Sequence, residues 1–148
     1  MIRTLFIGFW TVILTGFFAV MIILTSLVSK DGETPHKVAR IWAKCILAAS
    51  NINVTVKGLS NLKHTESYIY MPNHVSNFDI PVLQAYLPVQ FRWLAKAELF
   101  KIPIFGNAMK RAGYISIDRF DRKSAIQSLN KAAEIIRNGT SVIIFPEG

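Results

Sequence analysis

Cysteine is nearly absent from this chain, since Cys45 is the one cysteine in 148 residues. An internal disulfide is therefore excluded, which fits a reducing compartment without requiring one. Acidic residues are also few, with 9 Asp and Glu against 17 Lys and Arg, so the formal net charge is +8. This balance suits an anionic partner: nucleic acid, an acidic membrane surface or a phosphorylated substrate. The absence of a Lys/Arg-rich run, a zinc-finger spacing or an aromatic-basic RNA motif argues against nucleic acid.

The chain also lacks charge over a long N-terminal stretch. Thr4–Ser29 contains no charged residue, and as a helix it would be about 39 Å long, against about 30 Å for the core of a bilayer. The hydrophobic fraction of 51% and the mean hydropathy of +0.34 agree with a surface that partly meets lipid. A signal peptide is the alternative, because Arg3 supplies a basic start. However, the run is long, and no small-x-small cleavage site closes it before Lys30.

Basic residues follow this stretch within a short distance. The positive-inside rule therefore predicts that the remainder of the chain lies on the cytoplasmic side of the membrane. The residues concerned are Lys30, Lys37, Arg40 and Lys44.

A second helix is predicted after a turn at residues 31–35, with Thr34 as its cap and Pro35 in its first turn, ending near Ser50. Its apolar residues share one face, and its basic residues lie on another. The apolar residues are Val38, Ile41, Trp42, Cys45, Ile46 and Ala49. Such a helix can lie on a membrane surface or pack into a protein core, and the sequence leaves both possibilities open. Residues 1–50 are interpreted as membrane-anchoring helices.

A chain of this length suffices for one domain with a core, and not for two. Strand-like segments alternate with helical ones over residues 51–148, which predicts an α/β domain with a mixed, largely parallel sheet flanked by helices. The predicted strands are 53–57, 68–71, 91–94, 114–117 and 141–145, and the predicted helices are 78–87, 102–111 and 121–138.

The last of these helices carries the clearest signals for its two ends. Asp121 can cap its start, and Gly139 ends it. Its predicted buried stripe consists of Ile126, Leu129, Ala133 and Ile136.

The segment Asn73-His74-Val75-Ser76-Asn77-Phe78-Asp79 follows a predicted strand. A carboxylate can hold one ring nitrogen of a histidine as a donor and leave the other nitrogen free to take a proton. This is a general base, and the end of a strand is a common place for one in α/β sheets. With 3 His and 9 acids in the chain, the spacing alone would arise by chance about 0.2 times per chain. The alternative is that His74 satisfies loop carbonyls and Asp79 starts a helix.

Two further segments follow in order, Gly113-Tyr114-Ile115-Ser116-Ile117-Asp118-Arg119 and Phe145-Pro146-Glu147-Gly148, each at the end of a strand-like run. Together with the His-x4-Asp segment they resemble the 1-acylglycerol-3-phosphate acyltransferase family, over about residues 68–148. The resemblance implies an enzyme of phospholipid synthesis. Such an enzyme moves a fatty acyl group from a thioester to the free hydroxyl of lysophosphatidic acid and gives phosphatidic acid.

The resemblance also implies the roles of the catalytic residues and the substrates. His74 would take the hydroxyl proton, and Asp79 would orient His74 and stabilise its charged form. The donor would be acyl-CoA or an acylated acyl carrier protein, with no cofactor, no metal and no nucleic acid involved. The chain has no G-x-S-x-G elbow, so an acyl-enzyme intermediate is not expected.

Four residues are expected to bind substrate by the same resemblance. Arg119 would grip the acceptor phosphate with two parallel hydrogen bonds, and Lys96 would assist it. Glu147 would accept hydrogen bonds from the glycerol part, and Gly148 would let the backbone pass close to substrate. Ser116 departs from the family pattern, where a bulky apolar residue is often found.

The alternatives are acylation of another lysolipid or of glycerol 3-phosphate, and a non-enzymatic membrane-surface fragment. Family members continue past the Phe-Pro-Glu-Gly segment with further strands. This chain is therefore expected to be a fragment that lacks the C-terminal part of the domain.

Overall fold

Four parallel strands form the centre of the computed structural model, which describes residues 2–29, 32–63 and 66–147. The strands are β1 (Ile69–Tyr70), β2 (Phe91–Lys96), β3 (Ile115–Ile117) and β4 (Ser141–Ile144). Their order is β1-β4-β2-β3, and each neighbouring pair is parallel. The predicted α/β fold is confirmed, and the sheet is parallel throughout the described residues rather than mixed. Because all strands run one way, their carboxyl ends meet at one edge.

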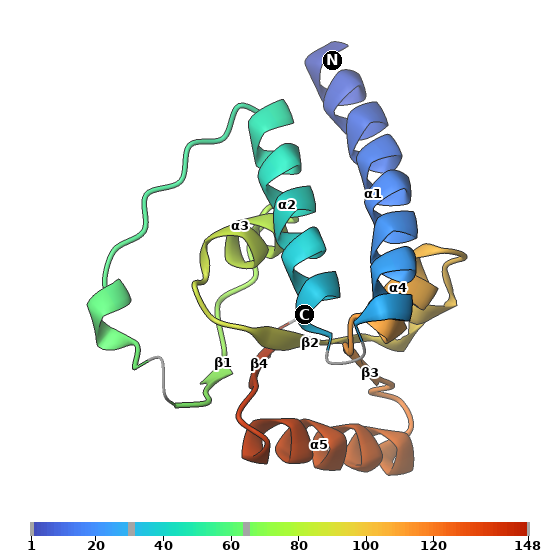
Figure 1. Ribbon diagram of the computed structural model, residues 1–148, viewed down its shortest axis with the longest axis vertical. Helices are drawn as coiled ribbons and strands as arrows, with labels where there is room; N and C mark the ends of the chain where they lie inside the picture. Colours follow the sequence, from blue (N-terminus) through green and yellow to red (C-terminus); the bar gives the residue numbers. More distant parts are fainter. Residues whose placement is uncertain (1, 30–31, 64–65, 148) are drawn as a thin grey trace.

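Helices cover both faces of this sheet (Figure 1). They are α1 (Ile2–Val28), α2 (Glu33–Ala49), α3 (Asp79–Tyr86), α4 (Phe105–Arg111) and α5 (Arg122–Arg137), with short 3-10 helices η1 (Leu59–Asn61) and η2 (Ala97–Lys101). In Figure 1, α1 and α2 stand side by side above the sheet and α5 lies below it.

Alternation along the strands creates a separate apolar core on each face. Phe91 and Trp93 of β2 belong to a cluster that also contains Ala19 of α1 and Ala39 of α2. Leu94, the next residue along β2, points to the opposite face and belongs to the other cluster, which lies between the sheet and α5. The N-terminal helices therefore contribute directly to the core on one face of the sheet.

The strand predicted at residues 53–57 is wrong. The segment has no strand partner and forms an extended loop away from the sheet (Figure 1). Its alternation has another cause, because Ile52 and Val54 pack against a small cluster that includes Ala43 and Ala85 of α2 and α3. An alternating pattern indicates that one side of an extended segment is buried. Here the buried side of the segment packs against α2 and α3 and not against another strand.

The start of α4 also differs from the prediction, which placed the helix at 102–111. The helix begins at Phe105 because Ile102 is extended before Pro103, and Ile104 has a positive φ of 63°. The amide of Phe105 donates to the carbonyl of Pro103, 2.6 Å away, which closes a tight turn. Proline disfavours helical geometry in the residue before it, so the helix starts after this turn.

The buried faces of α2 and α5 are rotated from the predicted ones. In α2, which begins at Glu33 with Gly32 rather than Thr34 as its cap, Ile41 is 53% exposed, whereas Ala39, Ala43, Leu47 and, as predicted, Ile46 are buried. In α5, which Asp121 caps as predicted, Ile126 and Leu129 are 49% and 51% exposed. The buried residues of α5 are Ser128 and Ala132. The fully buried residues of α5 are thus small, whereas α2 buries Ile46 and Leu47 beside the small residues Ala39 and Ala43.

Candidate active site

His74 and Asp79 lie together at the carboxyl edge of the sheet. His74 is in the loop after β1, and Asp79 is the first residue of α3. The Nδ1 atom of His74 is 3.1 Å from Oδ2 of Asp79, and each side chain is 24% exposed. Among the described residues, no hydrogen bond is made to Nε2 of His74. A shallow cleft lined by residues 74–77 opens beside the ring.

Asp79 holds the loop as well as the histidine. Its Oδ2 atom accepts hydrogen bonds from the backbone N–H groups of Val75 and Ser76, both at 2.8 Å. Burial of Asp79 acts to raise its pKa, but the hydrogen bonds from Ser76, His74 and Val75 together outweigh burial and lower the pKa below its ordinary 3.8. The carboxylate is therefore ionised at neutral pH, and its Oδ2 atom accepts a hydrogen bond from the Nδ1–H group of His74. This tautomer leaves Nε2 as the acceptor.

An aromatic stack behind the histidine was not anticipated from the sequence. The rings of His74 and Phe145 are stacked, with centroids 4.0 Å apart and planes 15° from parallel. Trp93 of β2 stacks on Phe145 in turn, at 5.5 Å. Phe145 directly follows β4, the strand that pairs with β1. An aromatic residue at the end of a buried strand is the signal that could have indicated this contact, but it is weak because such residues are common in cores.

Arg119 and Lys96 line one cavity of about 400 Å³, although they are well separated in the sequence. Lys96 ends β2 and Arg119 follows β3, and these two strands are paired. The other lining residues are Glu98, Leu99, Ile117 and Phe120. The cavity is connected to the histidine through Phe145, because an Nη atom of Arg119 lies 3.4 Å from the carbonyl oxygen of Phe145. The structure thus brings both predicted phosphate-binding residues to one place.

The remaining predicted substrate residues are at the end of the chain. Glu147 is exposed in the turn after β4, and Gly148 lies outside the described residues. No group of three or more His, Cys, Asp or Glu side chains that could hold a metal ion occurs among the residues the structure describes.

This arrangement can support proton transfer next to an anion-binding cavity. A neutral imidazole held through Nδ1 by a carboxylate can accept a proton at Nε2, and the carboxylate stabilises the imidazolium that forms. Two cations in the neighbouring cavity suit a phosphate. Among the described residues that line the cleft and the cavity, no serine or cysteine lies in a G-x-S-x-G elbow that could form a covalent intermediate.

Known proteins that are similar to this chain are acyltransferases. A family model described as acyltransferase matches residues 53–148. A chloroplastic 1-acyl-sn-glycerol-3-phosphate acyltransferase of Arabidopsis thaliana is 34% identical over 114 residues, which are 76% of this chain and 32% of the relative. An enzyme of the same name from Helicobacter pylori is 34% identical over 110 residues, covering 74% of this chain and 45% of the relative.

A solved structure is similar over nearly the whole chain. The crystal structure of the 1-acyl-sn-glycerophosphate acyltransferase PlsC from Thermotoga maritima superposes with a TM-score of 0.77 at 25% identity. The superposition covers 99% of this chain and 60% of that one. The chain thus spans about a third to a half of the length of the two sequence relatives.

Proposed function

Because the chain belongs to the acyltransferase family, we propose that it carries the catalytic pair and part of the acceptor site of a lysophosphatidic acid acyltransferase. The observation that supports this most directly is the His74–Asp79 pair, held through Nδ1 of a histidine that lines a cleft. The names of the matched relatives support lysophosphatidic acid as the acceptor.

The reaction needs a single displacement at the thioester. Nε2 of His74 takes the proton of the acceptor hydroxyl as the oxygen forms a bond to the carbonyl carbon. The carbon–sulfur bond breaks, and the thiolate recovers the proton from the imidazolium of His74. Asp79 stabilises that imidazolium while it lasts. The donor in this proposal is acyl-CoA or an acylated acyl carrier protein, and both leave as thiols.

Arg119 and Lys96 would hold the acceptor phosphate in the cavity that they share. A guanidinium grips phosphate with two parallel hydrogen bonds, and an ammonium adds a compact charge. This favours a phosphate-bearing lysolipid over an acceptor without phosphate. We place Glu147 and Gly148 beside the glycerol part, as the resemblance implies.

We further propose that α1 associates with a membrane and that the sheet lies on its cytoplasmic side. Thr4–Val28 is long and apolar enough to cross a bilayer. Most of its large apolar side chains are exposed, whereas Ala19 and Ile22 are buried in the core. Lipid around the exposed face would cover this apolar surface.

The proposal is tested by replacing the base. His74→Ala should lower turnover of lysophosphatidic acid with an acyl thioester by roughly 10²- to 10⁴-fold, which is the usual contribution of a general base. The assay measures thiol release and phosphatidic acid formation, with unfolding curves to show that the variant is folded. Turnover close to that of the unmodified chain would contradict the mechanism. Parallel assays with glycerol 3-phosphate and with a lysolipid that lacks phosphate identify the acceptor.

A further inference from the structure

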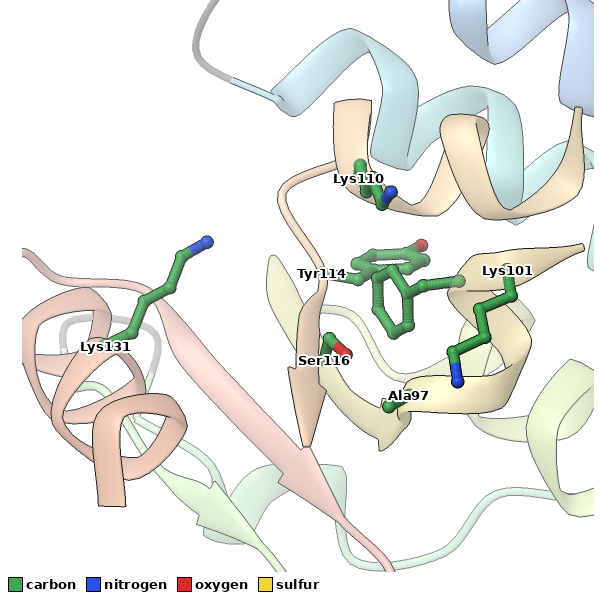
Figure 2. A pocket seen from close by; sticks show the side chains of 7 residues that line it. Ala97, Lys101, Lys110, Tyr114, Ser116 and Lys131 are labelled. Carbon is green, nitrogen blue, oxygen red and sulfur yellow. The ribbon is translucent and has the colours of Figure 1, made fainter. Parts of the chain in front are cut away.

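A second basic cavity lies at the β3 edge of the sheet. It has a volume of about 320 Å³ and is lined by Ala97, Phe100, Lys101, Lys110, Tyr114, Ser116 and Lys131. Its volume is at the lower end of the range for small-molecule pockets, which is roughly 300–1,000 Å³. Figure 2 shows Tyr114 just before β3 and Ser116 on it, with Lys101 and Lys131 on either side and Lys110 above. We call this cavity the lysine pocket.

Three separate elements supply the charge of the lysine pocket. Lys101 belongs to η2, Lys110 to α4 and Lys131 to α5. No acidic side chain is among the lining residues, and within the described part of the chain none of the three lysines has an ion-pair partner. Like charges around one cavity repel each other, so an anion placed among them would be stabilised by all three.

The walls of the lysine pocket fit an organic phosphate better than a free ion. Tyr114 and Phe100 are buried aromatic residues, and the hydroxyl of Tyr114 points to Oε1 of Gln84, 3.4 Å away. The ring therefore offers the pocket carbon surface rather than a free donor. Ser116 is exposed in the middle of β3, and its hydroxyl can donate a hydrogen bond. Apolar wall, hydroxyl and ammonium groups together suit a phosphate that is attached to a larger body.

The lysine pocket is placed away from the histidine but beside the acceptor cavity. β1, which leads to His74, and β3 are at opposite edges of the sheet. They are separated by three strand spacings, or roughly 14 Å. The 3-10 helix η2 contributes to both cavities, with Glu98 and Leu99 in one and Ala97 and Lys101 in the other. A ligand in the lysine pocket that takes part in the reaction must therefore reach the histidine through a long arm.

We propose that the lysine pocket binds the phosphate end of the acyl donor, an inference that rests on the proposed acyltransferase function. A donor thioester is at the tip of a long pantetheine arm, and the other end of that arm carries phosphate. The acceptor phosphate already has Arg119 and Lys96, so the donor phosphate needs cations of its own. Coenzyme A and acyl carrier protein share this phosphopantetheine chemistry, and the experiment distinguishes between them.

The test compares two triple variants of the full chain. Lys101→Gln, Lys110→Gln and Lys131→Gln together remove the charge of the pocket. The matched control removes the same charge from exposed residues that do not line it, Lys57→Gln, Lys123→Gln and Arg137→Gln. Binding is measured calorimetrically with coenzyme A, with holo acyl carrier protein and with pantetheine, which lacks phosphate. Because binding is read without turnover, a failure of the acyltransferase proposal would show in the thioester assay and not here.

We expect the pocket variant to bind coenzyme A or the carrier protein about tenfold or more weakly than the control variant does. The loss should shrink as salt is raised, because salt screens the exposed ammonium groups. Pantetheine should bind both variants alike. A loss for coenzyme A identifies the nucleotide donor, and a loss for the carrier protein alone identifies the protein donor. Equal binding of both phosphate-bearing ligands by the two variants would overturn the proposal. Binding of both variants to anionic phosphatidylglycerol vesicles is measured alongside. A pocket variant that binds these vesicles more weakly than the control variant does, but binds both phosphate-bearing ligands equally well, would also overturn the proposal, in favour of a membrane contact.

Discussion

Asp79 shows how much one carboxylate does at the scale of a residue. Its Oδ2 atom accepts hydrogen bonds from the backbone N–H groups of Val75 and Ser76 and from Nδ1 of His74. The conformation of the loop and the tautomer of His74 therefore depend on the same negative charge on Asp79. Its folded pKa is lowered, so the ionised form stabilises the fold at neutral pH. This contribution is lost as the pH falls through the folded pKa.

Asp79→Asn should therefore remove a pH-dependent part of the stability. At pH 7 the variant should be less stable by about 1–2 kcal/mol, because charged hydrogen bonds become neutral ones. The difference should shrink as the pH falls below 3.8 towards the lower folded pKa, where the carboxylate of the folded, unmodified chain takes up a proton. Urea unfolding of both chains between pH 3 and 7 measures the stability difference and its dependence on pH. Activity should fall by roughly 10²- to 10⁴-fold, because an amide does not stabilise the imidazolium. An unchanged pH dependence of stability would mean that Asp79 is not ionised in this role.

Arg119 is the residue on which acceptor recognition is expected to depend. Arg119→Lys keeps the charge but loses the two-pronged geometry, so the apparent KM for lysophosphatidic acid should rise while the thioester dependence stays nearly constant. Arg119→Ala should lower kcat/KM by about 10- to 150-fold, which corresponds to a lost charged hydrogen bond of about 1.5–3 kcal/mol.

The control for Arg119 is an acceptor that lacks the phosphate. On it the unmodified chain and Arg119→Ala should be similarly poor. An equal loss on both acceptors would make Arg119 structural, through its contact with the carbonyl of Phe145. Lys96, which lines the same cavity, would then be the main phosphate ligand.

At the scale of elements, the contact between η2 and α4 decides where both basic cavities lie. Gly106 in α4 approaches the backbone of Phe100 so closely that a Cβ at this position would overlap its carbonyl group. The amide of Gly106 also donates to the carbonyl of Ile102 at 2.8 Å. Only glycine allows this approach, so it sets the position of Lys101 and its neighbours.

Gly106→Ala should therefore destabilise the fold by about 1–3 kcal/mol, since η2 or α4 must move to accommodate the methyl group. Gly16→Ala in α1 is the matched control, because a Cβ there meets nothing within 4 Å. It should be neutral or stabilising by up to about 1 kcal/mol, as alanine favours a helix. Urea unfolding midpoints compare the two. Equal midpoints for both variants would show that the contact between η2 and α4 is loose.

At the scale of the whole molecule, two apolar surfaces have different surroundings. Phe9, Val12 and Phe17 of α1 are 61%, 72% and 58% exposed, on a helix that stands above the sheet (Figure 1). Ile126 and Leu129 of α5 are about half exposed on the opposite side. If α1 is the membrane-contacting element, only the first surface is covered by lipid.

Replacing Phe9, Val12 and Phe17 with serine should weaken partition into lipid vesicles, because each buried side chain contributes about 1.5–3 kcal/mol. Ile126→Ser with Leu129→Ser should leave partition nearly unchanged. Vesicle sedimentation followed by a carbonate wash measures both. These variants leave Ala19 and Ile22 in the core, whereas deletion of residues 1–50 would expose that core. If the unmodified chain stays in the supernatant when the vesicles are sedimented, membrane association through α1 is contradicted.

The sequence by itself determined the features that depend on neighbouring residues. The uncharged run became α1, Asp121 capped α5, and four of the five predicted strands are present. The His74–Asp79 contact was also predictable, since the five-residue spacing lets a loop close on the start of a helix. Such contacts need only local backbone geometry and short-range hydrogen bonds, which the order of residue types specifies.

Only the tertiary structure decided which surfaces meet. The alternating segment at 53–57 is not a strand because no described strand lies beside it, and the buried faces of α2 and α5 differ from those that their largest apolar residues predict. The stack of Phe145 on His74 and the shared cavity of Lys96 and Arg119 depend on the strand order β1-β4-β2-β3. Strand order is set by how the whole apolar surface is buried at once. A residue pattern read along the chain shows that a side is buried, but the packing of the other elements determines what buries it.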